Sequence, residues 1–299
     1  MFNGNVLVAK HDKIIYSASF GFTDATKVRK LSSIDRFNIG SITKEFSAVA
    51  LMQLIELGRL HLDAKVSSLI PELPKKWADE VSVKDLLQYT SGLPNVNWKK
   101  IKNDQDIFND LSLIDTLDFK PGTNYDYNNN NIFLRQFIVQ RLTGMPFKHY
   151  ADQFIFEPCS MNSSIMTPFE KEEYIANGFN NDLIADKKDL PITGGTYLTT
   201  ADLLKWAKCL HSNKIINQQS LYELGQQFDL AETQSSLGVA KFKDKKLTEH
   251  VHDGRAGSYE AILVSDLNKK WTIILLSNNY HGKVFELAAA IQSIFKGEN

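Results

Sequence analysis

A serine and a lysine three residues apart open an apolar stretch near the start of the chain. Ser41 and Lys44 follow Gly40, and apolar residues recur behind them at three- and four-residue spacing until Gly58. A helix beginning at Ser41 would place both side chains on one face, within hydrogen-bonding reach. Burial would lower the pKa of the lysine, so that its amine could act as a base toward the serine hydroxyl. The free N–H groups at the helix start would stabilise an oxyanion, so the pattern predicts a nucleophile site.

The same spacing occurs a second time, at Ser293 and Lys296. That pair ends the last helical pattern of the chain, where a lysine is stabilised by the helix dipole. A serine–lysine pair alone is therefore a weak indication of catalysis. Its meaning depends on the other elements of the fold and on the groups that they carry.

The composition is that of a globular, enzyme-sized protein. The 299 residues are 43% hydrophobic and 23% charged, with a formal net charge of −1. We expect no nucleic-acid or anionic-membrane partner for such a chain. No run reaches the roughly 18 apolar residues of a membrane span. The N-terminus enters a strand pattern directly, so we expect either a cytoplasmic protein or an exported one whose signal peptide was removed.

Cysteine and histidine positions do not form a metal-binding pattern. Cys159 and Cys209 lack metal-site spacing and are too few for a disulfide framework. We expect two small buried side chains and leave their pairing open. His250 and His252 would share one face of a strand, but two ligands make a poor zinc site. We therefore expect no metal and no cofactor.

Period-two patterns predict strands at both ends of the chain. A turn at His11–Asp12 joins the first two strands, and turns at 244–246 and 268–270 join later ones. The predicted strands are residues 6–9, 13–20, 239–242, 247–251, 259–265 and 271–276.

The stretches between and after these strands are mainly helical in period, with two long loops. Residues 63–73 and 177–191 are predicted loops, and residues 95–118 are partly helical with Trp98 as their main apolar anchor. Ser82 and Thr199 are predicted helix caps. The predicted helices are residues 41–57, 82–87, 132–142, 147–156, 199–210, 218–228 and 284–295.

This order of elements predicts an α+β fold, an α/β sandwich with one antiparallel sheet built from both termini and flanked by helices. Residues 1–60 and 235–299 would form a discontinuous sheet domain, and residues 61–234 a helical domain. The active site is expected between them.

The ordered motifs resemble the penicillin-recognising serine hydrolases, in the branch that holds class C β-lactamases, DD-peptidases, D-aminopeptidases and related esterases. That family has Ser-x-x-Lys on a helix, Tyr-x-Asn in a loop and Lys/His-x-Gly on a strand, in this order. The corresponding stretches here are Ser41–Lys44, Tyr127–Asn129 and His252–Gly254. Residues 86–93, 121–123, 157–161 and 194–203 are also similar, so the resemblance covers residues 5–294.

Two other stretches compete for these assignments. Lys120-Pro121-Gly122 also fits Lys-x-Gly, but it precedes the tyrosine motif and its proline disfavours a central strand. Tyr125 lies close by, but only Tyr127 is followed two residues later by asparagine. We therefore assign Tyr127, and place the third motif at His252, at the start of a strand.

The resemblance implies that Ser41 attacks a carbonyl and forms an acyl-enzyme. Lys44 and Tyr127 would share proton transfer, and which of them is the base stays open. A lysine cation nearby is expected to lower the pKa of Tyr127, which suits the protonation of a leaving group. Asn129 would hydrogen-bond the substrate or Lys44.

The strand motif is expected to bind the substrate. His252 would help to bind and polarise it, although a structural histidine is the alternative. The backbone N–H of Arg255 would complete the oxyanion hole with that of Ser41, and its side chain could recognise a carboxylate or point to solvent. Gly254 and Gly257 would keep the strand uncrowded.

His252 stands where typical β-lactamases carry lysine, so we expect an esterase or a D-amino-acid peptidase acting on a small ester, peptide or β-lactam substrate. A DD-carboxypeptidase or weak β-lactamase is the alternative within the class. A non-catalytic peptide-binding or scaffold relative is the alternative outside it. Loops 95–118 and 177–191 would set the substrate.

Overall fold

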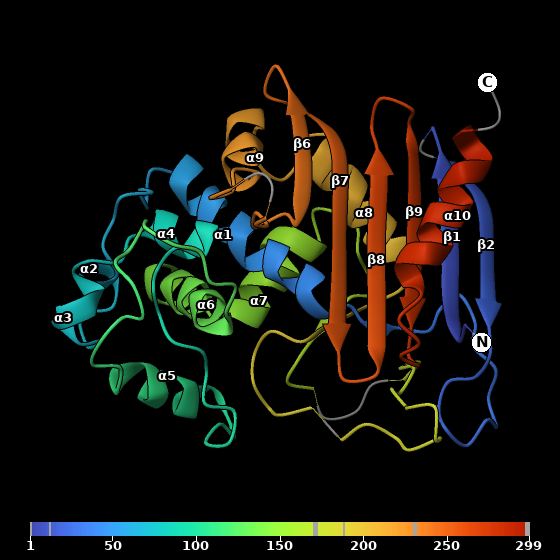
Figure 1. Cartoon of the computed structure of the whole chain (residues 1–299), viewed down its shortest axis with the longest axis horizontal. Helices are drawn as coiled ribbons and strands as arrows, with labels where there is room; N and C mark the ends of the chain where they lie inside the picture. The colour runs from blue at the N-terminus through green and yellow to red at the C-terminus, as the bar shows by residue number, and fades with distance from the viewer. Residues whose placement is uncertain (1, 12, 170–172, 188, 230–231, 297–299) are drawn as a thin grey trace.

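A six-stranded antiparallel sheet forms the centre of the computed structural model, which describes residues 2–11, 13–169, 173–187, 189–229 and 232–296 (Figure 1). Its strand order is β2-β1-β9-β8-β7-β6, so strands from the two ends of the chain lie side by side. The α+β prediction is therefore confirmed. The strands are β1 Gly4–Lys10, β2 Lys13–Phe20, β6 Val239–Lys243, β7 Lys246–Ala256, β8 Tyr259–Asp266 and β9 Trp271–Ser277. Asp12, in the predicted first turn, lies outside the described residues.

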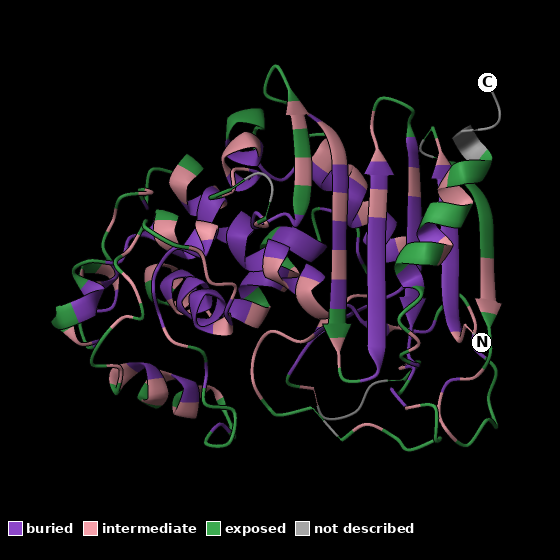
Figure 2. Ribbon diagram, in the orientation of Figure 1, coloured by how far each residue is buried: buried purple, intermediate pink, exposed green. Residues whose placement is uncertain are grey.

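Helices cover both faces of this sheet because its strands alternate between two apolar faces. Leu7 and Ala9 of β1 join the main core, on the side of α8 (Thr200–His211). Val6 and Val8 point the other way, into a smaller core under α10 (Val284–Lys296). Figure 2 shows the central strand β8 almost wholly buried, while α10 is largely exposed.

Helix α1 (Lys44–Glu56) is buried almost all round, as its sequence predicts. A short 3₁₀ helix, η1 (Gly40–Thr43), precedes it, and Ser41 lies in this turn. The other helices are α2 Val66–Leu69, α3 Lys75–Ala78, α4 Val83–Gln88, α5 Asp104–Ser112, α6 Asn129–Thr143, α7 Phe147–Ala151, its π-helical extension η2 Asp152–Phe156, and α9 Gln218–Leu224. A second sheet has the order β3 Phe37–Asn38, β5 Thr196–Leu198 and β4 Ile165–Met166.

Three local predictions were wrong. Residues 63–73 are not simply a loop, because α2 forms there. Trp98 is 44% exposed, and the apolar anchors of α5 are Ile107 and Leu111 instead. Helix α6 begins at Asn129, three residues earlier than expected, because Asn128 accepts a hydrogen bond from the backbone N–H of Asn131 and caps it. The cap at Thr199 and the capping box of Ser82 with Asp85 are both present.

The division into two domains remains a proposal. Helix α8 falls within residues 61–234, yet it packs against β9 and β1 and so covers the sheet. Among the described residues, no helix combines the length and the apolar character that a bilayer span requires.

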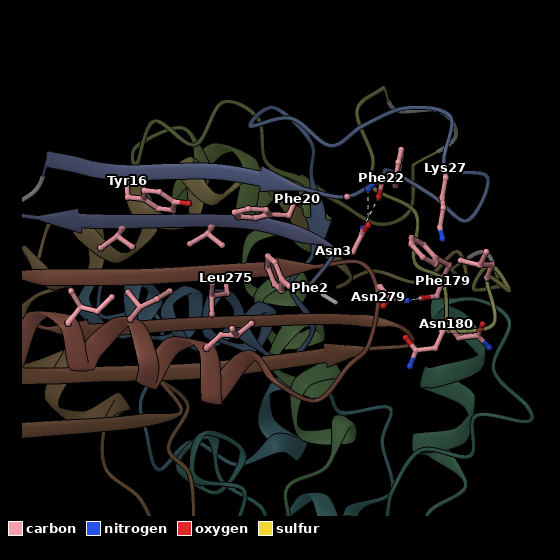
Figure 3. A pocket seen from close by; sticks show the side chains of 18 of the residues that line it. Phe2, Asn3, Tyr16, Phe20, Phe22, Lys27, Phe179, Asn180, Leu275 and Asn279 are labelled. Atoms are coloured by element: carbon pink, nitrogen blue, oxygen red, sulfur yellow. Dashed lines mark hydrogen bonds between the residues drawn. The ribbon is translucent and has the colours of Figure 1, made fainter.

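A cavity of about 830 Å³ lies on the α10 side of the sheet (Figure 3). Its walls come from β1, β2, β9 and α10, with Phe2, Tyr16 and Phe20 among its aromatic side chains. Since the core face of the sheet lies on the other side of these strands, this cavity is separate from the site of Ser41.

The sequence leaves the pairing of Cys159 and Cys209 open, and the structure joins them. Cys159, just after η2, forms a disulfide with Cys209 of α8, which lies 50 positions further along the sequence. Both side chains are buried, as the sequence predicts. The disulfide also links two helical segments covalently.

We expect the unreduced, denatured protein to show no free thiol and to show two after reduction. Loss of the link should lower the free energy of unfolding by about 2–4 kcal/mol, since the unfolded chain gains conformational entropy. Thermal unfolding with and without reductant measures this change. The double variant Cys159→Ser/Cys209→Ser is the control, because its unfolding should not respond to reductant. Thiols that titrate before reduction would contradict the link.

Candidate active site

Ser41 and Lys44 are brought together at the junction of η1 and α1. The Nζ of Lys44 donates a hydrogen bond to the Oγ of Ser41 at 3.0 Å. The 3₁₀ turn places the serine at the start of the helical segment, and the buried helix behind it fixes the lysine. The amine is thus in position to exchange a proton with the hydroxyl.

The surroundings of Lys44 favour its neutral form. Burial lowers the pKa of Lys44 to about 8, and the nearby cation of Arg135 acts in the same direction. Asp253 opposes them by stabilising the ammonium. A substantial fraction of this amine is therefore unprotonated near neutral pH, unlike that of an ordinary lysine.

Tyr127 lies beside the same pair, with its ring centroid 4.9 Å from the Nζ of Lys44 and 4.7 Å from the ring of Tyr89. The expectation of a lowered pKa was wrong. Burial raises the pKa of Tyr127 far above its usual range, and a hydrogen bond with Ser41 offsets only part of that rise. Burial therefore keeps the phenol protonated, with Nζ of Lys44 lying over the face of its ring.

A run of buried asparagines holds Tyr127 in place. Asn128 donates hydrogen bonds to the carbonyl oxygen of Leu93 at 2.8 Å and to Asp126 at 2.7 Å. Asn130 donates to the carbonyl oxygen of Pro94 at 2.7 Å. Side chains that looked like turn formers are therefore anchors between the tyrosine loop and the segment after α4. Asn129, at the first position of α6, is half-buried.

Strand β7 passes very close to η1, and glycines make this approach possible. A Cβ atom on Gly254 would lie 1.9 Å from the carbonyl oxygen of Ile39 and 2.8 Å from the amide nitrogen of Ser41. A Cβ atom on Gly40, which has a φ of +53°, would lie 2.3 Å from the amide nitrogen of Arg255. The N–H groups of Ser41 and Arg255 therefore belong to one small region, as an oxyanion hole requires.

The side chain of Arg255 lies on the opposite face of β7 from Gly254, since successive residues of a strand alternate. Its guanidinium stacks on Tyr280 at 3.8 Å from the ring centroid. The structure thus places the side chain away from Ser41. Arg255 is exposed, which agrees better with the alternative that its side chain points to solvent. The motif containing His252 lies in the second half of β7, not at a strand start as expected.

Gly257 forms the turn after β7. Its φ is +54°, and a Cβ atom there would lie 2.6 Å from a carboxylate oxygen of Asp186. Asp186 accepts hydrogen bonds from the N–H and the hydroxyl of Ser258 at 2.7 and 2.6 Å. This glycine therefore lets the 177–191 loop dock on the end of β7.

Arg135 is a site residue that the sequence analysis missed. It is completely buried on α6, and its Nε and Nη2 both donate to the carbonyl oxygen of Leu86, at 3.2 and 2.5 Å. Its guanidinium lies 4.8 Å from the ring centroid of Tyr89. The sequence feature that could have indicated this residue is a cation in the middle of the apolar helical pattern of residues 132–142.

A buried cluster behind the strand motif was also missed. Oε1 of Glu45 lies 2.5 Å from Nδ1 of His252 and 3.0 Å from Nε2 of His250. Trp206 donates to Oε2 of the same carboxylate at 2.5 Å, and His211 lies 3.0 Å from the other nitrogen of His250. No local pattern around Glu45 indicates that a residue of α1 reaches these histidines.

Glu45, His250 and His252 are the one group of three potential metal ligands that the described residues contain. Zinc ligands in a tetrahedral site lie about 2.0–2.2 Å from the ion and hence about 3.3 Å apart. The 2.5 Å contact between Glu45 and His252 is too short for both atoms to bind one ion. The cluster fits hydrogen bonding, and the absence of a metal remains a prediction.

A cavity of about 990 Å³ opens at the end of β7. Ala256 and Gly257 line it together with Tyr259, Tyr197 and part of the 177–191 loop. Since Gly254 packs on Ser41, this cavity starts only two residues further along the strand. None of residues 95–118 is among those that line it.

Fold and site together define a protein of the β-lactamase and penicillin-binding-protein type. The chain matches the Beta-lactamase family over residues 3–294 and therefore belongs to that family, whose members are serine hydrolases.

Among curated relatives, the chain is 26% identical to penicillin-binding protein 4* of Bacillus subtilis (strain 168), over 96% of this chain and 70% of that protein. It is also 26% identical to the putative penicillin-binding protein PbpX of the same organism, over 73% of this chain and 57% of that protein. The chain thus spans little more than half the length of the second relative.

Three solved structures share the fold. A penicillin-binding protein from Bacillus halodurans has a TM-score of 0.86 at 23% identity, covering 98% of this chain and 96% of that one. A class C beta-lactamase has a TM-score of 0.84 at 20% identity, covering 100% and 92%. D-amino acid amidase from Ochrobactrum anthropi SV3, complexed with L-phenylalanine amide, has a TM-score of 0.75 at 21% identity, covering 94% and 87%.

We expect acylation of Ser41 to rise with pH through about 8, since only neutral Lys44 can accept the serine proton. Arg135→Gln should move this midpoint to higher pH, because the variant loses the cation that disfavours the ammonium. The measurement is the pH dependence of p-nitrophenol release from p-nitrophenyl butyrate in a single turnover. Arg141→Gln, on the same helix in an exposed ion pair with Glu72, is the matched control. An unmoved midpoint in Arg135→Gln would refute the influence assigned to that cation.

Proposed function

We propose that the protein is a serine hydrolase that forms an acyl-enzyme at Ser41 with an ester or amide substrate. The observation that carries this proposal is the 3.0 Å hydrogen bond between Lys44 and Ser41. It is supported by the lowered pKa of Lys44, about 8, which makes the amine a usable base.

Proton transfer follows from the two opposite pKa shifts. Neutral Lys44 takes the proton of Ser41 as Oγ attacks the substrate carbonyl, and the N–H groups of Ser41 and Arg255 hold the oxyanion. Tyr127 remains a phenol, so it donates its proton to the leaving alkoxide or amine and is reprotonated from Lys44. Water then attacks the acyl-enzyme with the same groups in reverse.

The proposed substrate class is an ester or a D-amino-acid amide or peptide. The cavity at the end of β7, which begins two residues beyond Gly254, offers room for part of such a substrate. Arg255 is turned to the other face of the strand, which disfavours the recognition of a terminal carboxylate by its guanidinium. Similarity to a D-amino acid amidase agrees with this class. Asn129 and His252 are proposed to bind the substrate.

Hydrolysis of p-nitrophenyl butyrate and of D-phenylalanine amide should be measured for the wild type, Ser41→Ala and Lys44→Ala. We expect turnover by the wild type, loss of it in Ser41→Ala, and a decrease of roughly 100-fold or more in Lys44→Ala, since general-base catalysis contributes about 10²–10⁴. Circular dichroism checks that both variants fold. Near-normal turnover in Ser41→Ala would exclude it as the nucleophile.

A DD-carboxypeptidase or weak β-lactamase is the second candidate, favoured by the similarity to penicillin-binding proteins. Covalent labelling by a fluorescent penicillin should then be slow in the wild type and absent in Ser41→Ala. His252→Lys should label faster, because it restores the cation found at this position in typical β-lactamases. Equal labelling of wild type and His252→Lys would count against the role of this position.

A non-catalytic relative that binds peptide is the candidate from another class. Absence of both turnover and penicillin labelling in the wild type, with retained binding of a D-amino-acid peptide, would favour it. The hydrogen-bonded Ser41–Lys44 pair argues for catalysis, because a binding protein has no use for a desolvated amine on a hydroxyl.

A further inference from the structure

The carboxylate of Glu45 is fully buried and receives hydrogen bonds from three different elements. His252 and His250 of β7 contact its Oε1 at 2.5 and 3.0 Å, and Trp206 of α8 donates to its Oε2 at 2.5 Å. Glu45 directly follows Lys44 on α1. The carboxylate of Glu45 therefore links α1, which follows Ser41, to strand β7 and to helix α8 through hydrogen bonds.

The charge state of Glu45 decides where the protons lie. Burial alone would raise its pKa, but His250 and His252 outweigh burial and hold the pKa of Glu45 well below its usual range. An ionised carboxylate only accepts hydrogen bonds, so Nε2 of His250 and Nδ1 of His252 must both carry protons. The tautomer of His252 is thereby fixed, with Nε2 as the nitrogen on the side of the ring away from Glu45.

The outer end of the cluster is His211 of α8. Burial, followed by the proximity of His250, lowers the pKa of His211 to about 3, so its ring is neutral near pH 7. A neutral imidazole can accept a hydrogen bond from Nδ1 of His250 or donate one to it at the observed 3.0 Å. His211 therefore provides a partner for one nitrogen of His250 while the other nitrogen contacts Glu45.

His252 connects this cluster with the active site. It lies two residues before Gly254, on the same face of β7, and the Gly254 backbone packs directly against the amide of Ser41. Its ring packs against Gly238, where a Cβ atom would lie 2.8 Å from Cγ of the imidazole. With Glu45 on one side and this backbone on another, the ring has a single orientation.

We propose that Glu45 is a positioning residue for the substrate-binding histidine: it holds His252 in one tautomer and one orientation, with Nε2 presented to the substrate beside Ser41. This inference rests on the proposed function. Lysine at this position of the family is a flexible side chain, whereas here the position holds a rigid imidazole ring. The buried partner of that ring, Glu45, is the residue next to Lys44.

A double-mutant cycle tests the inference. Acylation by p-nitrophenyl butyrate is measured as a function of pH for wild type, Glu45→Gln, His252→Gln and the double variant. Glu45→Gln should slow acylation about 10- to 100-fold, by analogy with the carboxylates that orient metal-binding histidines. The double variant should be no slower than His252→Gln, because Glu45 acts through His252. Effects that multiply independently would overturn the proposal.

Nitrogen-15 NMR of the histidine rings gives a second readout that requires no turnover. The wild type should show His252 with its proton on Nδ1, assigned by the loss of its signals in His252→Gln. Glu45→Gln should release the ring into both tautomers. Should Glu45→Gln fail to fold, the wild-type spectrum still decides: a proton on Nε2 alone would overturn the proposal. If no substrate is turned over, the proposed function fails while this spectrum still tests the positioning.

Two matched variants separate positioning from stability. Glu56→Gln changes the same residue type on the same helix, where the carboxylate accepts a hydrogen bond from the N–H of Asn217, and it should leave acylation and the histidine spectrum unchanged. Trp206→Phe removes one donor to Glu45 and should lower the melting temperature with a smaller effect on acylation. Stoichiometric Zn²⁺ binding by the wild type and not by Glu45→Gln would show a metal site instead.

Discussion

The site depends on the close approach of β7 to the turn that carries Ser41. At this contact a strand from the end of the chain meets a helix from its beginning, with no Cβ atom between them at Gly40 or Gly254. The approach places two N–H groups in the same region and so creates the conditions for oxyanion binding. Because β1 and β9 also pair, the sheet itself enforces the meeting of the two chain ends.

Burial acts in opposite directions on the two proton-transfer groups. It disfavours the charged form of each, so it lowers the pKa of Lys44 and raises that of Tyr127. These two shifts suit the roles proposed for the pair, a base at Lys44 and an acid at Tyr127. Arg135 strengthens the first effect from the interior of α6, where a cation near a second cation favours the neutral amine.

Sequence reasoning predicted the elements with a strong period and the motifs that they carry. The buried helix behind Ser41 and the terminal strands could be read directly, since their apolar spacing is local information. The disulfide, Glu45 and Arg135 could not, because each depends on which distant elements meet. The wrong direction for the pKa of Tyr127 has the same cause: the sequence shows neighbours in the chain but not how much water a side chain has lost.

Arg255 shows how one position can serve two surfaces. Its amide nitrogen lies at the nucleophile, while its guanidinium stacks on Tyr280 on the other face of the sheet. In the proposed mechanism this position therefore contributes through the main chain alone, and every amino acid except proline supplies the same donor. Substitution of Arg255 can therefore change the outer surface while the backbone donor stays in place. The identity of the side chain at this position then does not report the role proposed for its backbone.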